Sequence, residues 1–104
     1  MKLITLLKIL DKVSYVIECL VIEANGEAKS VLPETIALVE VESDLTLTER
    51  DRILGYLRDA CDAFRGEGAF REEGRNVRAS AGILSGLSNE LWQAVLKHPQ
   101  LTSG

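Results

Sequence analysis

The sequence predicts a mainly α-helical fold, a small bundle of three or four helices within a single domain covering residues 1–104. Two observations lead to this prediction. Apolar residues recur at helical spacing in separate segments, and these segments are flanked by residue types that begin and end helices. The apolar residues are mostly Leu, Val, Ile and Ala, and aromatic residues make up only 5% of the chain. We therefore expect a core packed mainly from aliphatic side chains.

The first predicted helix covers residues 3–24 and carries a long apolar seam. Its members alternate at spacings of three and four, as the core positions of packed helices do: Leu3, Leu6, Leu10, Val13, Ile17, Leu20 and Ala24. The far side also holds apolar residues, among them Ile4, Tyr15, Cys19 and Ile22. A helix that is apolar over most of its circumference must be buried on more than one side. We therefore expect a homodimer, with the first six seam residues as the self-association site.

An α+β fold is the alternative, with an N-terminal β-hairpin around Asn25-Gly26 followed by two helices. Asn-Gly is a strong hairpin signal, and residues 16–22 include several β-branched side chains. The same dipeptide also ends helices, with Gly in the left-handed conformation. Strict alternation fails between Val16 and Ile22, which favours the helix. For residues 34–43 the two interpretations are balanced, since Pro33 fits the first position of a helix or the start of a strand.

Two more helices follow. Thr48, Glu49, Arg50 and Asp51 resemble a capping box, and the apolar face behind them extends to about Arg65, where Gly66 and Gly68 are expected to stop the helix. The last helix is predicted for residues 76–97, before Pro99. Its apolar residues keep helical phase throughout: Leu84, Leu87, Leu91 and Val95.

Composition indicates a cytoplasmic protein without a membrane partner. The formal net charge of -4 disfavours nonspecific attraction to nucleic acid or anionic lipid. Charged residues such as Lys8, Asp11 and Glu18 interrupt the first apolar segment well before the roughly 20 residues that a membrane span needs. We expect no signal peptide here. Cys19 and Cys61 are too few for a disulfide framework, and we expect two buried, reduced thiols.

The sequence predicts neither catalysis nor a cofactor or metal site. The glycine run that starts at Gly66 lacks the third glycine of a dinucleotide-binding loop and follows a helix rather than a strand. His98 is the only histidine and has no Cys cluster to share a metal with. We therefore expect that the protein is not an enzyme.

Two charged groups are the candidate partner-binding residues. Arg71, Arg75 and Arg78 have helical spacing and can grip carboxylates or phosphates. Acidic residues in the first half can attract a basic partner: Glu40, Glu42 and Asp44. The favoured function is a small acidic protein-binding module, namely an adaptor, an inhibitor or an immunity-type antagonist, that acts as a homo-oligomer. The alternative is a nucleic-acid-associated regulator that uses the arginine face.

Overall fold

The computed structural model describes residues 1–66 and 76–102. They form four long helices and one short helix: α1 (Leu3–Val21), α2 (Asn25–Val41), α3 (Leu47–Arg65), α4 (Asn76–Leu96) and α5 (Pro99–Thr102). The described part of the chain contains no strand. The mainly α fold is therefore confirmed, and the alternative with an N-terminal hairpin is wrong.

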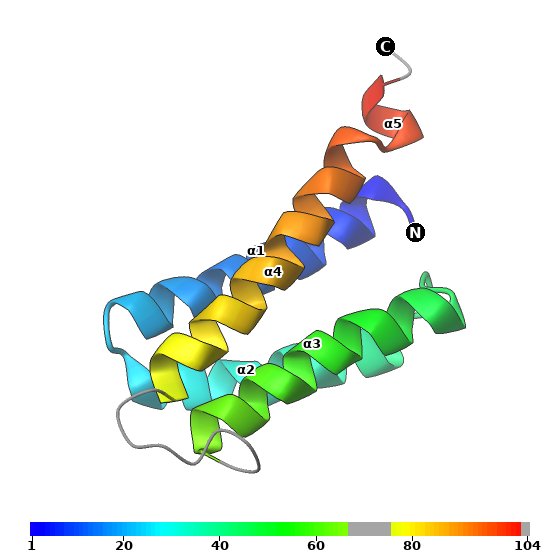
Figure 1. Cartoon of the computed structure of the whole chain (residues 1–104). Helices are drawn as coiled ribbons and strands as arrows, with labels where there is room; N and C mark the ends of the chain where they lie inside the picture. Colours follow the sequence, from blue (N-terminus) through cyan, green and yellow to red (C-terminus); the bar gives the residue numbers. More distant parts are fainter. Residues whose placement is uncertain (67–75, 103–104) are drawn as a thin grey trace.

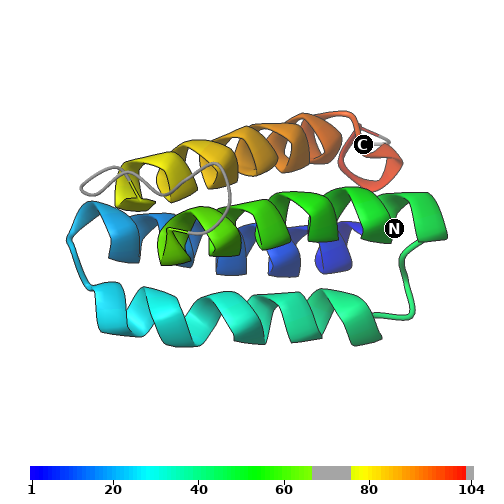
Figure 2. The ribbon, with the colours of Figure 1, turned by 60° about the horizontal axis from the view of Figure 1, so that its bottom comes forward.

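The four long helices run up and down in sequence order and close into a ring. Each packs against its neighbour in the chain, and α1 also packs against α4. Figure 2 shows that consecutive helices are antiparallel, and that the α1–α2 and α2–α3 connections lie at opposite ends of the bundle. In Figure 1 the bundle divides into two layers, α1 with α4 and α2 with α3. The short helix α5 follows α4 and packs against its end.

The core between the layers is aliphatic, as the composition predicts. All four long helices contribute side chains that are almost completely buried, among them Leu6, Val13, Leu32, Leu57 and Leu84. The aromatic residues Tyr56 and Phe64 pack only partly buried at the edge of this cluster. Both cysteines are buried and free, which confirms that prediction.

The end of α1 differs from the prediction. The helix stops at Val21, and Glu23 adopts the left-handed conformation with φ 61°. The Ala24 N–H donates to the Cys19 carbonyl at 2.8 Å, and the Glu23 N–H donates to the Leu20 carbonyl at 3.3 Å. This pattern is a Schellman motif, in which both bonds satisfy carbonyl groups at the helix end. Glu23 thus takes the position that the sequence analysis gave to Gly26.

Asn25 and Gly26 instead open α2, which settles the undecided segment. Residues 34–41 continue the same helix, in which Val39 is buried and Ile36 packs partly buried against the core, whereas Val41 is exposed. Pro33 lies in the middle of α2 and not at its start. Because proline has no backbone N–H, α2 lacks the hydrogen bond that residue 33 would donate to the carbonyl of Lys29.

The boundaries of α3 and α4 agree with the prediction apart from the capping residue. Thr46, and not Thr48, is the N-cap of α3: its hydroxyl accepts the Glu49 N–H at 3.1 Å, while the Glu49 carboxylate accepts the Thr46 N–H at 2.8 Å. The reciprocal pair makes a full capping box, which needs Glu or Gln three residues after the N-cap. Thr46 has Glu49 at that position, whereas Thr48 has Asp51. Gly66 ends α3 in the left-handed conformation with φ 73°, as expected. Gly68 lies outside the described residues.

Candidate functional site

The predicted self-association seam lies inside the single chain. Four of its members are buried in the bundle core, and the other two are partly buried against it: Leu6, Leu10, Val13 and Leu20, then Leu3 and Ile17. The seam therefore supplies the contacts between α1 and its neighbours α2 and α4. A second copy would have to contact α1 mainly outside the four buried residues of this seam.

The predicted acidic group is also engaged within the chain. Asp44 Oδ2 accepts the backbone N–H of Lys2 at 2.6 Å and the Thr5 hydroxyl at 2.8 Å. Glu42 lies 3.7 Å from the Lys8 ammonium group, and Glu40 lies 3.6 Å from the Arg58 guanidinium group. Asp44 thereby joins the α2–α3 connection to the first turn of α1, where backbone N–H groups have no partner inside the helix.

The pKa of Asp44 predicts a pH dependence of stability. The hydrogen bonds from the Lys2 N–H and the Thr5 hydroxyl favour the charged carboxylate and hold its pKa below the usual value. The unfolded chain then binds the proton first as pH falls, so this stabilisation is complete above about pH 3.9 and is lost as pH falls through the lower folded pKa. The urea concentration at the midpoint of unfolding should decrease as pH falls below about 4, and we expect Asp44→Asn to make this decrease less steep. The control Asp51→Asn, which changes an exposed carboxylate, should leave the dependence of the midpoint on pH unchanged. Equal slopes for Asp44→Asn and the unmodified protein would contradict the assignment.

The arginine row is represented by one residue in the described part of the chain. Arg78 is exposed near the start of α4. Arg71 and Arg75 lie outside the described residues, so the structure does not place them relative to Arg78.

A charged cluster that the sequence analysis did not single out joins α3 to α4. Arg52 binds Glu90 through two nitrogens, at 2.9 Å from Nε and 2.5 Å from Nη2, and the Tyr56 hydroxyl donates to the same carboxylate at 3.0 Å. The hydrogen bond from Arg52 is the main reason that the pKa of Glu90 is lowered. A carboxylate held charged by two donors is a poor proton donor near neutral pH, so this cluster serves to join the helices.

Contacts at the end of the bundle fix the register of α1 against α4 and α5. The Leu3 N–H donates to Gln100 Oε1 at 2.9 Å. His98 Nδ1 accepts the Gln100 N–H at 3.1 Å, which leaves Nε2 to donate to the Met1 carbonyl at 2.8 Å. With the two helices antiparallel, residues near the start of α1 therefore lie beside residues near the end of α4.

The outer surface of the α1–α4 layer carries exposed apolar side chains next to a shallow depression. The exposed residues are Leu7 on α1 with Trp92 and Leu96 on α4, and the Trp92 side chain is 49% exposed. The depression has a volume of about 410 Å³ and is lined by uncharged residues of the two helices: Ser14, Ile17, Ser85, Ser88, Asn89 and Trp92. We call these eight residues the α1–α4 face. Sequence spacing alone does not mark Trp92 as exposed, because an apolar residue next to Leu91 fits a buried helix face equally well.

The described residues offer neither a metal centre nor a membrane span. No three His, Cys, Asp or Glu side chains among residues 1–66 and 76–102 gather closely enough to hold a metal ion. None of the helices in that same part of the chain is both long and apolar enough to cross a bilayer. Comparison of the chain with protein-family models, with curated proteins and with solved structures gives no match.

Proposed function

We propose that this protein is a small, acidic, cytoplasmic protein-binding module that acts as a homodimer through the α1–α4 face. The observation that carries the proposal is an exposed tryptophan at the edge of a depression that it lines together with uncharged residues of α1 and α4. Tryptophan is enriched among the residues that dominate binding energy at protein interfaces. The predicted homodimer is thus kept, but its interface moves from the buried seam to this outer surface.

The α1–α4 face carries both an exposed tryptophan and a depression, which supports a second copy of the chain as its occupant. In a two-fold dimer the same patch meets itself, so a projection and a hollow on one patch can fill each other. Trp92 supplies the projection, and the space beside Ser14 and Ser85 supplies the hollow. The residues that line the depression carry no charge, so the centre of the contact places no like charges together.

The size of the face suits a reversible dimer. Two helices of about 30 Å length that lie side by side present an outer surface of roughly 600 Å² per copy, of which the α1–α4 face is a part. A dimer that covered this whole surface on both copies would bury roughly 1,200 Å², at the lower limit of stable, specific interfaces. We therefore propose a dimer that forms at micromolar concentration and carries twice the net charge of -4 of one chain. A negative net charge speeds association with a basic protein partner, which suits an adaptor, inhibitor or antagonist.

Sedimentation equilibrium between about 1 and 300 µM tests the dimer directly. We expect a monomer–dimer equilibrium, and Trp92→Ala should raise the dissociation constant at least about tenfold because it removes the projection. Leu47→Ala is the matched control, since Leu47 is an exposed apolar residue at the start of α3, away from the α1–α4 face. A monomer at the highest concentration would defeat the proposal.

A second variant keeps the test independent of tryptophan truncation. Ser85→Arg fills the depression with a charged side chain from an exposed position, so the bundle should fold normally by circular dichroism while dimerisation is lost. This variant retains Trp92, the only tryptophan of the chain. In the unmodified protein, the emission maximum of Trp92 should shift to shorter wavelength as the protein concentration rises, because dimerisation removes the ring from water. In Ser85→Arg the emission maximum should stay constant. The nucleic-acid alternative stays a prediction, because the structure describes only Arg78 of the arginine row.

A further inference from the structure

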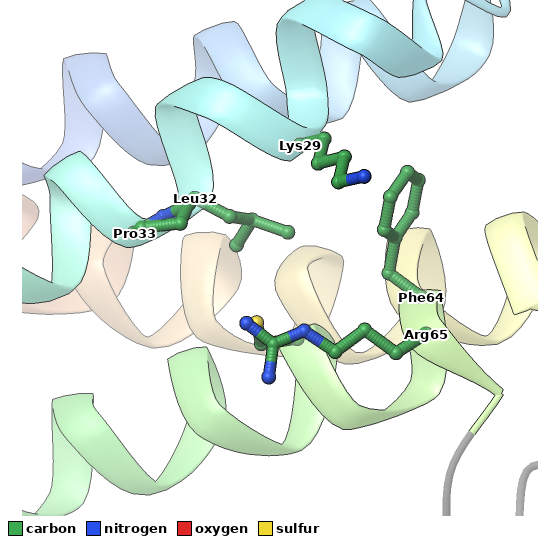
Figure 3. Close-up of a pocket in the computed structure, with 6 residues that line it drawn as sticks. Lys29, Leu32, Pro33, Phe64 and Arg65 are labelled. Atoms are coloured by element: carbon green, nitrogen blue, oxygen red, sulfur yellow. The ribbon is translucent and has the colours of Figure 1, made fainter.

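A pocket opens between α2 and α3, in the layer that does not contribute to the α1–α4 face. Its volume is about 470 Å³, which is within the range of small-molecule sites. Figure 3 shows the residues that line it: Lys29, Leu32, Pro33, Cys61, Phe64 and Arg65. The first three come from α2 and the others from α3. Both helices are therefore needed to form the pocket.

The walls of the pocket are apolar. Leu32 and Cys61 are buried at its base, and Phe64 packs partly buried against the core. Pro33 adds an exposed ring on the α2 side. The missing N–H of this proline leaves no donor for the Lys29 carbonyl at the normal helical position. These side chains offer a ligand apolar contact on more than one side.

Two cationic side chains complete the pocket from opposite helices. In Figure 3 the Lys29 ammonium group points toward the Phe64 ring, and the Arg65 guanidinium group reaches back along α3 to lie opposite Leu32. Neither cation forms an ion pair with a carboxylate among residues 1–66 and 76–102, whereas Lys8, Arg52 and Arg58 all do. Two positive charges are thus concentrated over an apolar surface in a chain whose net charge is -4.

We propose that this pocket binds a small organic carboxylate with an apolar body, such as a medium-chain fatty acid or an aryl carboxylate. The carboxylate lies between Lys29 and Arg65, where hydrogen bonds with charge on both partners are strongest. The apolar body contacts Leu32, Pro33 and Phe64, and its removal from water supplies the remaining affinity. A ligand of one negative charge matches this site better than a phosphate, because the apolar walls do not solvate a second charge.

The test is a titration of the full chain with three matched probes. Calorimetry measures the affinity of each probe, and amide chemical shifts locate where it binds. Octanoate has both charge and chain, octan-1-ol has the chain alone, and acetate has the charge alone. We expect octanoate to bind at least about tenfold more tightly than either of the others. The shifts that it causes should be centred on Leu32, Phe64 and Arg65. Octanoate binding should weaken with added salt, whereas octan-1-ol binding should not.

Variants separate the roles of the two cations from nonspecific apolar binding. Lys29→Gln and Arg65→Gln should each weaken octanoate at least about threefold and leave octan-1-ol unchanged. Lys12→Gln, which removes an exposed lysine of α1, is the matched control and should leave all three affinities unchanged. Equal affinity for octanoate and octan-1-ol would overturn the proposal. So would unchanged octanoate binding in the Lys29→Gln/Arg65→Gln double variant, or no octanoate binding at about 5 mM. The dimer is measured separately, so either proposal can fail alone.

Discussion

Leu57→Ala is expected to lower the free energy of unfolding by about 3 kcal/mol, which is the usual effect of truncating a fully buried leucine side chain to alanine. Leu57 lies on α3, and its side chain is 0% exposed. It belongs to the cluster of buried side chains to which all four long helices contribute. Truncation removes apolar contacts and leaves a cavity, because the surrounding helices relax only partly.

Urea unfolding followed by circular dichroism measures this loss. Leu47→Ala is the matched control, because it makes the same change on the same helix at a side chain that is 71% exposed. We expect the control to stay within about 0.5 kcal/mol of the unmodified protein. A loss of the same size for both variants would show that the burial of Leu57 does not decide the result.

Pro33→Ala is expected to raise the free energy of unfolding by about 1–2 kcal/mol. A proline inside a helix costs about 3 kcal/mol, through the missing hydrogen bond and the contact of its ring with the preceding turn. Replacing the proline relieves this cost. The unfolded chain of Pro33→Ala is more flexible than that of the unmodified protein, and this difference offsets about 1 kcal/mol of the gain in stability. The new N–H of residue 33 is placed to donate to the carbonyl of Lys29, the bond that α2 now lacks.

The second proline of the chain provides the control. Pro99 is the first residue of α5, a position where the N–H has no partner within the helix. Pro99→Ala should therefore bring no gain, and it should lose a few tenths of a kcal/mol up to about 1 kcal/mol through the unfolded chain. A gain in both variants, or in neither, would show that the position of Pro33 inside α2 does not limit stability.

Helical periodicity predicted most of the fold, but only where a segment presents a clear apolar face. The faces of α3 and α4 were visible in sequence, so their extents were predicted to within a residue or two. In α2 the buried residues Ala28, Val31 and Leu32 are mixed with Pro33 and with exposed Gly26. Its periodicity is weak for that reason, and the packing of α1 and α3 on either side makes this segment helical.

The candidate sites were harder to predict, because they depend on residues that are distant in sequence. Asp44 was expected to face a partner, yet it binds Lys2, 42 positions away. Nothing in the local sequence indicates that contact. The pocket combines Lys29 with Arg65, and the α1–α4 face combines Ser14 with Ser85. Sequence spacing describes one helix at a time, whereas each of these surfaces is made by two.

The α1–α4 face joins the first and the last of the four long helices. Its two halves are therefore synthesised far apart in time, and the face exists only after α4 has closed the ring against α1. A second copy, or any other protein that binds this surface, can recognise only a chain in which both α1 and α4 are folded. Such binding stabilises the native state at the expense of the unfolded one. Association through this face would thus select chains with a closed bundle over chains in which α4 has not yet formed.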